Sequence, residues 1–397
     1  MKILVCVTAS FPYGNKETFF ANELVYLSTA FDKVIILPLY NPFPNNEIRK
    51  VPENVTVLKP VIPRNKLLRF INGIGFNSID VFCKEFIFHK VYKSKYRTFR
   101  LLNSYLNFQH YSKVFKKIIN ENDDFLIYSY WAEASFFLDN KLSNAKKIVR
   151  MHRTDFYVEV NNNYLPLRKS IYEKADLLLP ISDDIAKRLQ SQYLMDNDKI
   201  KINRLGVKNN ISPDVDIKIS DEIVIVSCSR VDAIKRVLLL FDILKSYEGS
   251  RIIVWHHFGD GDEFSELKQG VEQLNSSKIK VKLHGWCSQK YIFDFYNDNK
   301  VHWFINVSLH EGIPVSIMEA MSFSVPVIAT DAGATREIVN GENGLLLPIN
   351  FDSKVLLNCI EDDEKYKDKR ANAYETWKNK YNSDTNYYQL IKTFKGL

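Results

Sequence analysis

The chain has 397 residues and a net charge of +7, with 46% hydrophobic and 25% charged residues. This length exceeds one typical domain, and the composition excludes collagen-like, low-complexity and intrinsically disordered proteins. The five cysteines are scattered without a Cys-x-x-Cys pair, which indicates a reducing compartment and argues against a disulfide framework or a zinc site. No apolar run approaches the roughly 18 residues of a membrane span. We therefore expect a cytoplasmic protein of two domains, soluble or peripheral to a membrane.

The positive charge is confined to the N-terminal half of the chain. Residues 1–180 hold 26 Lys and Arg against 16 Asp and Glu, whereas residues 181–397 hold 28 against 31. This asymmetry predicts a polyanionic partner for one domain, such as an acidic membrane or a phosphorylated lipid. Nucleic acid would also suit a basic surface, but the chain carries no nucleic-acid-binding motif, and we do not expect that partner.

In the N-terminal half, short apolar runs alternate with helical patterns. The first run, residues 3–9, resembles the start of a signal peptide, but it is short and no small-residue cleavage site follows, so we interpret it as a buried strand. A helix is expected over about residues 17–29. Further strands are expected at residues 33–39, 124–130, 146–151 and 175–182. Continuous apolar strands of this kind are typical of a parallel sheet covered on both faces, in a doubly wound α/β domain.

A polar, proline-containing stretch near residues 207–222 predicts a linker, after which the same architecture begins again. Strands are expected at residues 222–229, 251–258, 279–285, 301–308 and 325–330. The pattern predicts two Rossmann-like domains facing each other across a cleft, with ligands at the C-terminal ends of the strands. The expected domains are residues 1–206 and 207–375. Residues 376–397 form a C-terminal helical segment that can cross back to the first domain.

The segment HEGIPVSIME, residues 310–319, places two carboxylates around a proline. Pro314 favours a helix start, so we expect Glu311 in the preceding loop and Glu319 in the second helical turn. Between them, free backbone N–H groups at the positive end of the helix dipole can donate hydrogen bonds to an anion. A phosphate-bearing ligand with hydroxyl groups on both sides, such as a nucleotide sugar, fits this arrangement. The alternative is a surface helix whose acids only favour its N-terminus.

This segment, together with VPVIATDAGATREIV (residues 325–339) and GENGLLLP (residues 341–348), resembles the signature of the family 4 retaining glycosyltransferases. The resemblance implies the GT-B fold and metal-independent transfer of a hexose-type sugar from a nucleotide sugar, with no cofactor. We expect a UDP-sugar donor rather than a GDP-sugar, and a glycan or polyprenyl-diphosphate-linked acceptor in bacterial cell-surface polysaccharide or glycolipid synthesis. The alternatives are a non-catalytic nucleotide-sugar-binding or scaffold protein and a GT-B epimerase.

The resemblance also assigns roles in the second domain. Arg230 and Lys235 would hold the leaving diphosphate, although Ser229 and Arg236 replace glycines that are usual in that loop. Glu319 would bind the ribose, and Glu311 the sugar. The backbone around the helix start would hold the donor through Gly312, Ile313, Pro314, Val315 and Ser316. The segment that begins HGWC at residue 284 would receive the base, with Gly285 and Trp286 as candidates.

The first domain contributes the other candidates. His152 and Asp155, in the segment MHRTD, match a motif whose histidine lies beside the donor sugar, and we place Asp155 on the acceptor side. The segment SFPYGNKETFFANEL, residues 10–24, resembles the family's first loop and helix, which face the phosphates and the acceptor. The resemblance makes Gly14 a candidate for donor binding and Glu17 a candidate on the acceptor side. FGDGDE, residues 258–263, contains an Asp-x-Asp pair of the kind that binds a metal in other transferases. Such pairs recur by chance in this chain, so no metal site is expected.

A basic stretch extends from Lys84 to Lys117, with nine Lys and Arg and one acid. Apolar residues recur at spacings of three or four: Phe88, Tyr92, Tyr96, Phe99, Leu102 and Leu106. This spacing predicts one amphipathic helix. It would lie on an anionic membrane or present charge to a polyprenyl-diphosphate acceptor. The alternative is a core-facing helix with a solvated basic side.

Overall fold

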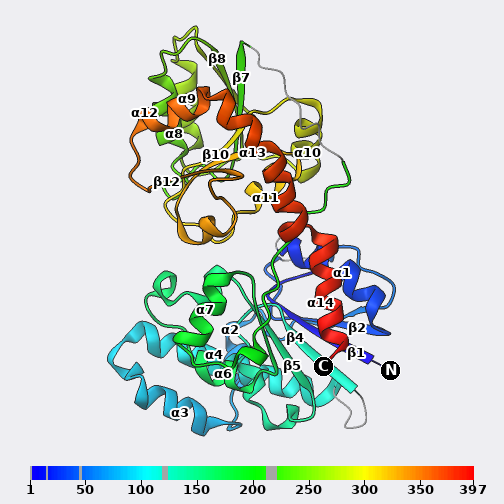
Figure 1. Ribbon diagram of the computed structural model, residues 1–397. Coiled ribbons are helices and arrows are strands. Elements are labelled where there is room, and N and C mark those ends of the chain that lie inside the picture. Colours follow the sequence, from blue (N-terminus) through cyan, green and yellow to red (C-terminus); the bar gives the residue numbers. More distant parts are fainter. Residues whose placement is uncertain (1, 15–16, 44–46, 119–123, 212–220) are drawn as a thin grey trace. The chain divides into compact units, whose positions relative to one another are not determined.

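The computed structural model describes residues 2–14, 17–43, 47–118, 124–211 and 221–397. The chain divides into two units, unit 1 with Met1–Leu205 and Tyr387–Leu397, and unit 2 with Gly206–Asn386 (Figure 1). The boundaries expected from the sequence lie after residues 206 and 375, whereas the units divide after Leu205 and Asn386. No helix in the described part of the chain combines the length and the hydropathy needed to cross a bilayer.

Unit 1 contains a six-stranded parallel sheet in the order β3-β2-β1-β4-β5-β6. Its strands are β1 (Lys2–Thr8), β2 (Lys33–Pro38), β3 (Val55–Val57), β4 (Asp124–Ser129), β5 (Lys146–Met151) and β6 (Leu177–Pro180). Its helices are α1 (Thr18–Ala30), α2 (Lys66–Asn72), α3 (Ile79–Phe88), α4 (Lys95–Ile118), α5 (Arg153–Phe156), α6 (Arg168–Lys174) and α7 (Asp183–Ser191), with short 3₁₀ turns such as η1 (Val91–Lys93). Consecutive residues of the central strands are buried, which explains their unbroken apolar sequence.

Unit 2 repeats this plan, with the strand order β12-β11-β10-β7-β8-β9. Its strands are β7 (Glu222–Cys228), β8 (Ile252–Phe258), β9 (Ile279–Leu283), β10 (Trp303–Asn306), β11 (Val327–Thr330) and β12 (Gly344–Leu347). Its helices are α8 (Val237–Lys245), α9 (Phe264–Glu272), α10 (Gln289–Asp298), α11 (Val315–Ser322), α12 (Ser353–Glu361) and α13 (Asp363–Thr376), followed by the π-helical turn η7 (Trp377–Tyr381). The expected α/β class with two doubly wound parallel sheets is confirmed.

The last helix, α14 (Ser383–Lys395), returns the chain to unit 1. It lies beside α1 and β2 (Figure 1), and Tyr387 contacts Tyr26 with ring centroids 5.2 Å apart. Leu390 and Phe394 belong to the same buried cluster as the apolar face of α1. Residues near the C-terminus therefore complete the core of the first unit.

The remaining differences from the sequence predictions have physical causes. The two strands that were not expected, β3 and β12, are short strands at the edges of their sheets. The single amphipathic helix expected over the basic stretch is wrong, because the chain breaks between α3 and α4 and passes through η1. Of the expected linker, residues 212–220 lie outside the described residues.

Candidate functional site

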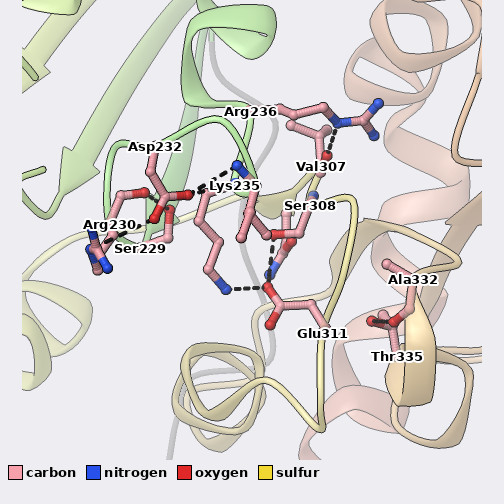
Figure 2. A network of polar contacts seen from close by, with 12 residues as sticks. Ser229, Arg230, Asp232, Lys235, Arg236, Val307, Ser308, Glu311, Ala332 and Thr335 are labelled. Atoms are coloured by element: carbon pink, nitrogen blue, oxygen red, sulfur yellow. Dashed lines mark hydrogen bonds and ion pairs between the residues drawn. The ribbon is translucent and has the colours of Figure 1, made fainter. Parts of the chain in front are cut away.

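The order of the strands in unit 2 places a crevice between β7 and β10. From β7 the chain adds β8 and β9 on one side, then returns to add β10, β11 and β12 on the other. The loops that follow β7 and β10 leave neighbouring strands in opposite directions, and ligands of doubly wound sheets bind at this kind of switch point. A small cavity there is lined by Cys228, Lys235, Asn306 and Ser308, among others. Arg230, Lys235 and Glu311 lie on these two loops (Figure 2).

Lys235 and Glu311 form an ion pair at the centre of this site. The Nζ atom of Lys235 donates to Oε1 of Glu311 at 2.6 Å, and the side chains are 25% and 8% exposed. Ser308 Oγ donates to the same carboxylate oxygen at 2.7 Å (Figure 2), and Asn306 Nδ2 donates to it at 3.1 Å. The sequence prediction did not include Asn306 and Ser308. The signal that could have revealed them is that both are polar residues at the end of the apolar run FINVS. Three donors therefore fix the Glu311 carboxylate beside the lysine.

The loop between β7 and α8 turns sharply to present Lys235. The Asp232 carboxylate accepts hydrogen bonds from the backbone N–H groups of Ile234 at 3.1 Å and Lys235 at 3.0 Å. Arg236 has a φ of 53°, in the left-handed region that favours glycine, which is the residue usual at this position in the resembled family. Its guanidinium donates to the carbonyl oxygens of Val307 at 2.6 Å and Ile349 at 3.0 Å. These bonds stabilise a backbone conformation that a non-glycine residue rarely adopts.

Arg230 reaches outward from the same loop, with a side chain that is 66% exposed. It lies 3.4 Å from the Asp262 carboxylate and 3.6 Å from that of Asp232. The Gly-Asp-Gly turn after β8 packs closely here, because a Cβ on Gly259 would lie 1.8 Å from the Ser229 carbonyl oxygen. The turn therefore supports the loop and supplies an acidic partner for Arg230.

Helix α11 begins directly after Pro314, which is its N-cap residue. Proline has no side-chain acceptor, so the N–H groups of the first turn, including those of Val315 and Ser316, receive no capping bond from it. Gly333, at φ 59°, packs against the Glu311 loop on the other side, where a Cβ would lie 2.1 Å from the Glu311 carbonyl oxygen. The predicted arrangement, with Glu311 in a loop and a helix start between the two acids, is present.

Glu319 is buried in the second turn of α11. Burial raises the pKa of its carboxyl group to about 7, although a hydrogen bond from Gln289 partly offsets this effect. Gln289 Nε2 donates to Glu319 Oε1 at 2.6 Å from the first residue of α10. The sequence prediction missed Gln289, because nothing along the chain links it to a residue 30 positions away.

We expect the Glu319→Gln variant to lose a pH dependence of stability. The pKa of Glu319 is about 7 in the folded chain against an ordinary value of 4.5, so the folded state binds this proton more tightly than the unfolded state. The free energy of unfolding therefore falls as the pH rises through this window. The Tm of the parent protein should therefore fall as the pH rises from about 5 to about 7, and the Tm of the variant should not show this fall. Thermal unfolding at several pH values measures the difference.

The Glu272→Gln variant provides the matched control, because Glu272 is exposed on α9. It should follow the parent protein at every pH. Parallel Tm curves for Glu319→Gln and the parent would show that the Glu319 carboxyl has no raised pKa.

The base-side candidates lie in the turn between β9 and α10. Gly285 has a φ of 64°, and its carbonyl oxygen accepts from Gly259 N–H at 2.8 Å. The Trp286 side chain is 77% exposed. It therefore does not fill a gap in the core, which leaves its ring free to stack on a planar ligand.

The corresponding switch point in unit 1 lies between β1 and β4. Here Glu17 organises the loop after β1. Its carboxylate accepts from the backbone N–H groups of Ala9 at 3.0 Å, Ser10 at 2.8 Å and Phe11 at 2.6 Å, and from Trp131 Nε1 at 2.7 Å. Gly14 has a φ of 66°, and a Cβ there would lie 2.0 Å from the Phe43 ring. The Glu17 carboxylate is thus engaged in shaping the loop.

His152 and Asp155 follow β5 in the same unit. Asp155 accepts from the backbone N–H groups of His152 at 2.6 Å and Ala132 at 2.7 Å, so it joins the loops after β4 and β5. The His152 ring contacts those of Tyr130 and Trp131, with centroids 4.9 Å and 4.6 Å away. Its buried Nδ1 lies 3.8 Å from the Asp155 carboxylate, and its buried Nε2 has no hydrogen-bond partner among the described residues. A ligand hydroxyl group could supply that partner.

A pocket of about 350 Å³ opens beside these residues. Its lining includes Tyr40, Arg100, Trp131, Glu133, Asp155 and Asn161. Arg100 Nη2 lies 3.2 Å from the Glu133 carboxylate. Aromatic rings beside charged and amide groups can bind a polyhydroxylated ligand through its apolar faces and its hydroxyl groups together.

No metal site is evident at these strand ends. Across the described ranges, no group of three or more His, Cys, Asp and Glu side chains has the arrangement needed to hold an ion. His256 and His257, adjacent on β8, contact different partners, His284 and Ser227. Metal independence nevertheless stays a prediction.

Comparison with solved structures defines the class of fold. The chain is similar to the lipopolysaccharide outer core galactosyltransferase WaaB, with a TM-score of 0.69, 19% identity and full coverage of both chains. It is also similar to HepE from Anabaena in complex with UDP, with a TM-score of 0.65, 17% identity and full coverage of both chains. Together with the two parallel sheets, these similarities show the GT-B fold.

Comparison of sequences shows which known proteins the chain is similar to. Residues 222–361, a part of unit 2, match the family model described as "Glycosyl transferases group 1". The chain is 28% identical over 205 residues, 50% of each chain, to the putative colanic acid biosynthesis glycosyltransferase WcaL of Escherichia coli. It is 28% identical over 198 residues, 48% of this chain and 54% of the relative, to a lipopolysaccharide 1,6-galactosyltransferase of Salmonella typhimurium. The chain thus spans about half the length of the curated relatives that it matches.

Proposed function

We propose that the protein is a retaining glycosyltransferase that moves a hexose-type sugar from a UDP-sugar to a glycan or lipid-linked acceptor. The observation that carries the proposal is the partly buried ion pair of Lys235 and Glu311 beside the first turn of α11, within the part of unit 2 that matches the family model. This arrangement offers a cation, a hydroxyl-accepting carboxylate and free backbone amides at one switch point.

The donor diphosphate would bind between the two loops of unit 2. Lys235 and Arg230 would neutralise the charge that grows on the departing phosphate, and the first-turn amides of α11 would donate to its oxygens. Because Lys235 is already bonded to Glu311, the diphosphate and the sugar hydroxyls would bind on either side of that pair. Glu319, supported by Gln289, would accept a hydrogen bond from a ribose hydroxyl, and the exposed Trp286 would stack on the base.

The proposal includes retention of the anomeric configuration of the transferred sugar and independence from a metal ion. The acceptor hydroxyl would attack on the face from which the diphosphate leaves, and its proton would pass to the departing phosphate oxygen. The two cations would supply the charge neutralisation that a divalent metal supplies in other transferases. His152, whose buried Nε2 has no hydrogen-bond partner among the described residues, would contact the donor sugar.

The acceptor would bind in the pocket of unit 1. Its aromatic rings, the Arg100–Glu133 pair and the Asp155 loop suit a sugar. The names of the relatives support cell-surface polysaccharide or lipopolysaccharide synthesis, and the UDP complex of HepE supports a uridine nucleotide. The cytoplasm, with access to the inner face of the membrane, would be the setting.

A panel of nucleotide sugars tests this proposal. The purified chain is incubated with UDP-glucose, UDP-galactose, their N-acetyl derivatives and GDP-mannose, with and without polyprenyl-diphosphate-linked sugars, and release of the nucleoside diphosphate is followed. We expect release from a UDP-sugar that depends on acceptor. Nucleotide binding without release from any donor would favour the alternative function, a nucleotide-sugar-binding or scaffold protein.

A further inference from the structure

Unit 1 exposes a large set of apolar side chains along α2, α3 and the first turns of α4. On α2 and the turn that follows, exposed residues include Leu67, Phe70, Ile71, Ile74 and Phe76. On α3, η1 and α4 they include Ile87, Phe88, Tyr92, Tyr96, Phe99 and Leu102. Phe88 and Phe99 are 77% and 67% exposed. We call this set of side chains the apolar face.

The two halves of α4 differ in their exposure. The second half of α4 packs into the unit, with Phe108, Tyr111 and Phe115 buried. The first half exposes Tyr96, Phe99 and Leu102 while it buries Leu101, so the core-facing alternative holds for the second half and only in part for the first. Between α3 and the first half of α4 lies an apolar groove of about 370 Å³, lined by Ile79, Phe86, Ile87, Leu101, Leu102 and Tyr105 among others. An apolar groove bordered by exposed aromatic and aliphatic side chains is typical of an interaction site.

The charge around the apolar face identifies its partner. Residues 64–100 contain nine Lys and Arg and two acids, Asp80 and Glu85, a net charge equal to the +7 of the whole chain. The Glu85 side chain is 10% exposed and is engaged with Tyr164 and the Leu167 N–H, so it offers little negative charge to a partner. Lys84, Lys90, Lys93 and Lys95 are exposed among the apolar residues.

We propose that unit 1 docks on an anionic lipid bilayer through this apolar face, with the aromatic and aliphatic side chains inserted among the lipids and the lysines bonded to headgroup phosphates. Aromatic rings and lysine stems suit the interfacial region, where an apolar body meets a polar layer. A protein partner would need an unusually acidic and apolar surface, and a second copy would place two +7 segments against each other. The anionic bilayer satisfies both the charge and the apolar area.

Sedimentation with vesicles tests this inference independently of sugar transfer. Vesicles of phosphatidylglycerol and phosphatidylcholine should sediment the full chain at low salt, whereas phosphatidylcholine alone should not. The double variant Phe88→Ser with Phe99→Ser should reduce partitioning about tenfold or more, because two large apolar side chains no longer leave water. The double variant Lys90→Glu with Lys93→Glu should have a similar effect, because headgroup attraction is lost.

Matched substitutions elsewhere on unit 1 provide the controls. Leu194→Ser removes an apolar side chain that is 74% exposed outside the apolar face, and Lys169→Glu reverses an exposed charge on α6. Both should sediment like the parent protein, and all variants should keep UDP binding, which reports on unit 2. Equal sedimentation of apolar-face and control variants would overturn the inference. Concentration-dependent self-association that Phe99→Ser abolishes, without vesicle binding, would also overturn it.

Discussion

We expect the replacement of Lys235 by Met to lower the rate of the proposed sugar transfer by about 10²- to 10³-fold, the usual loss when one preorganised donor to a developing oxyanion is removed. Met keeps the length of the side chain but removes the charge that would meet the departing diphosphate. The substitution also leaves the nearly buried Glu311 carboxylate without its cation, so UDP affinity should fall together with the rate. Steady-state kinetics with the donor found in the nucleotide-sugar panel would measure the change.

A second lysine of unit 2 controls for the loss of a positive charge. Lys245→Met removes an exposed ammonium group at the end of α8, where its partner Asp242 is also exposed. Its transfer rate should equal that of the parent protein. A Lys235→Met enzyme that keeps its rate within a factor of about two would exclude the proposed electrostatic role.

The Glu311→Gln variant should separate sugar recognition from nucleotide binding. Glutamine has nearly the same shape but accepts more weakly, so the loss of a charged hydrogen bond to a sugar hydroxyl costs about 1.5 to 3 kcal/mol, or about 10- to 150-fold in rate. UDP, which lacks the sugar, should bind at least as tightly as before, because Lys235 no longer has a competing carboxylate. Kinetics with the UDP-sugar and calorimetric titration with UDP measure the two effects.

The comparison variant for this experiment is Glu272→Gln, on the exposed side of α9. It should change neither quantity. A parallel loss of UDP affinity in Glu311→Gln would assign Glu311 to the architecture of the phosphate site rather than to the sugar.

The repeated α/β architecture could be predicted from the sequence because strands buried on both faces leave unbroken apolar runs. All ten expected strands are present, among them β1, β4, β7 and β10, which frame the two switch points. The edge strands β3 and β12 were not expected, since strands of three and four residues carry little pattern of their own. The break between α3 and α4 also escaped prediction, because apolar spacing continues across it.

From the sequence, the candidate site could be predicted only as a set of charged and polar residues that follow predicted strands. The arrangement around Pro314 follows from local chain stereochemistry, and the structure agrees with it. Contacts between distant residues could not be predicted: the Lys235–Glu311 pair spans 76 positions, and the Gln289–Glu319 bond spans 30. The roles of Glu17 and Asp155 in holding backbone loops likewise depend on three-dimensional proximity.

Hydrogen–deuterium exchange with and without UDP tests the central claim most directly, namely that a nucleotide diphosphate binds between the loops after β7 and β10. We expect UDP to slow amide exchange in residues 229–236 and 311–319, and uridine, which lacks the diphosphate, to protect these segments far less. Protection by UDP confined to other parts of the chain, or equal protection by uridine, would contradict the assignment of this site.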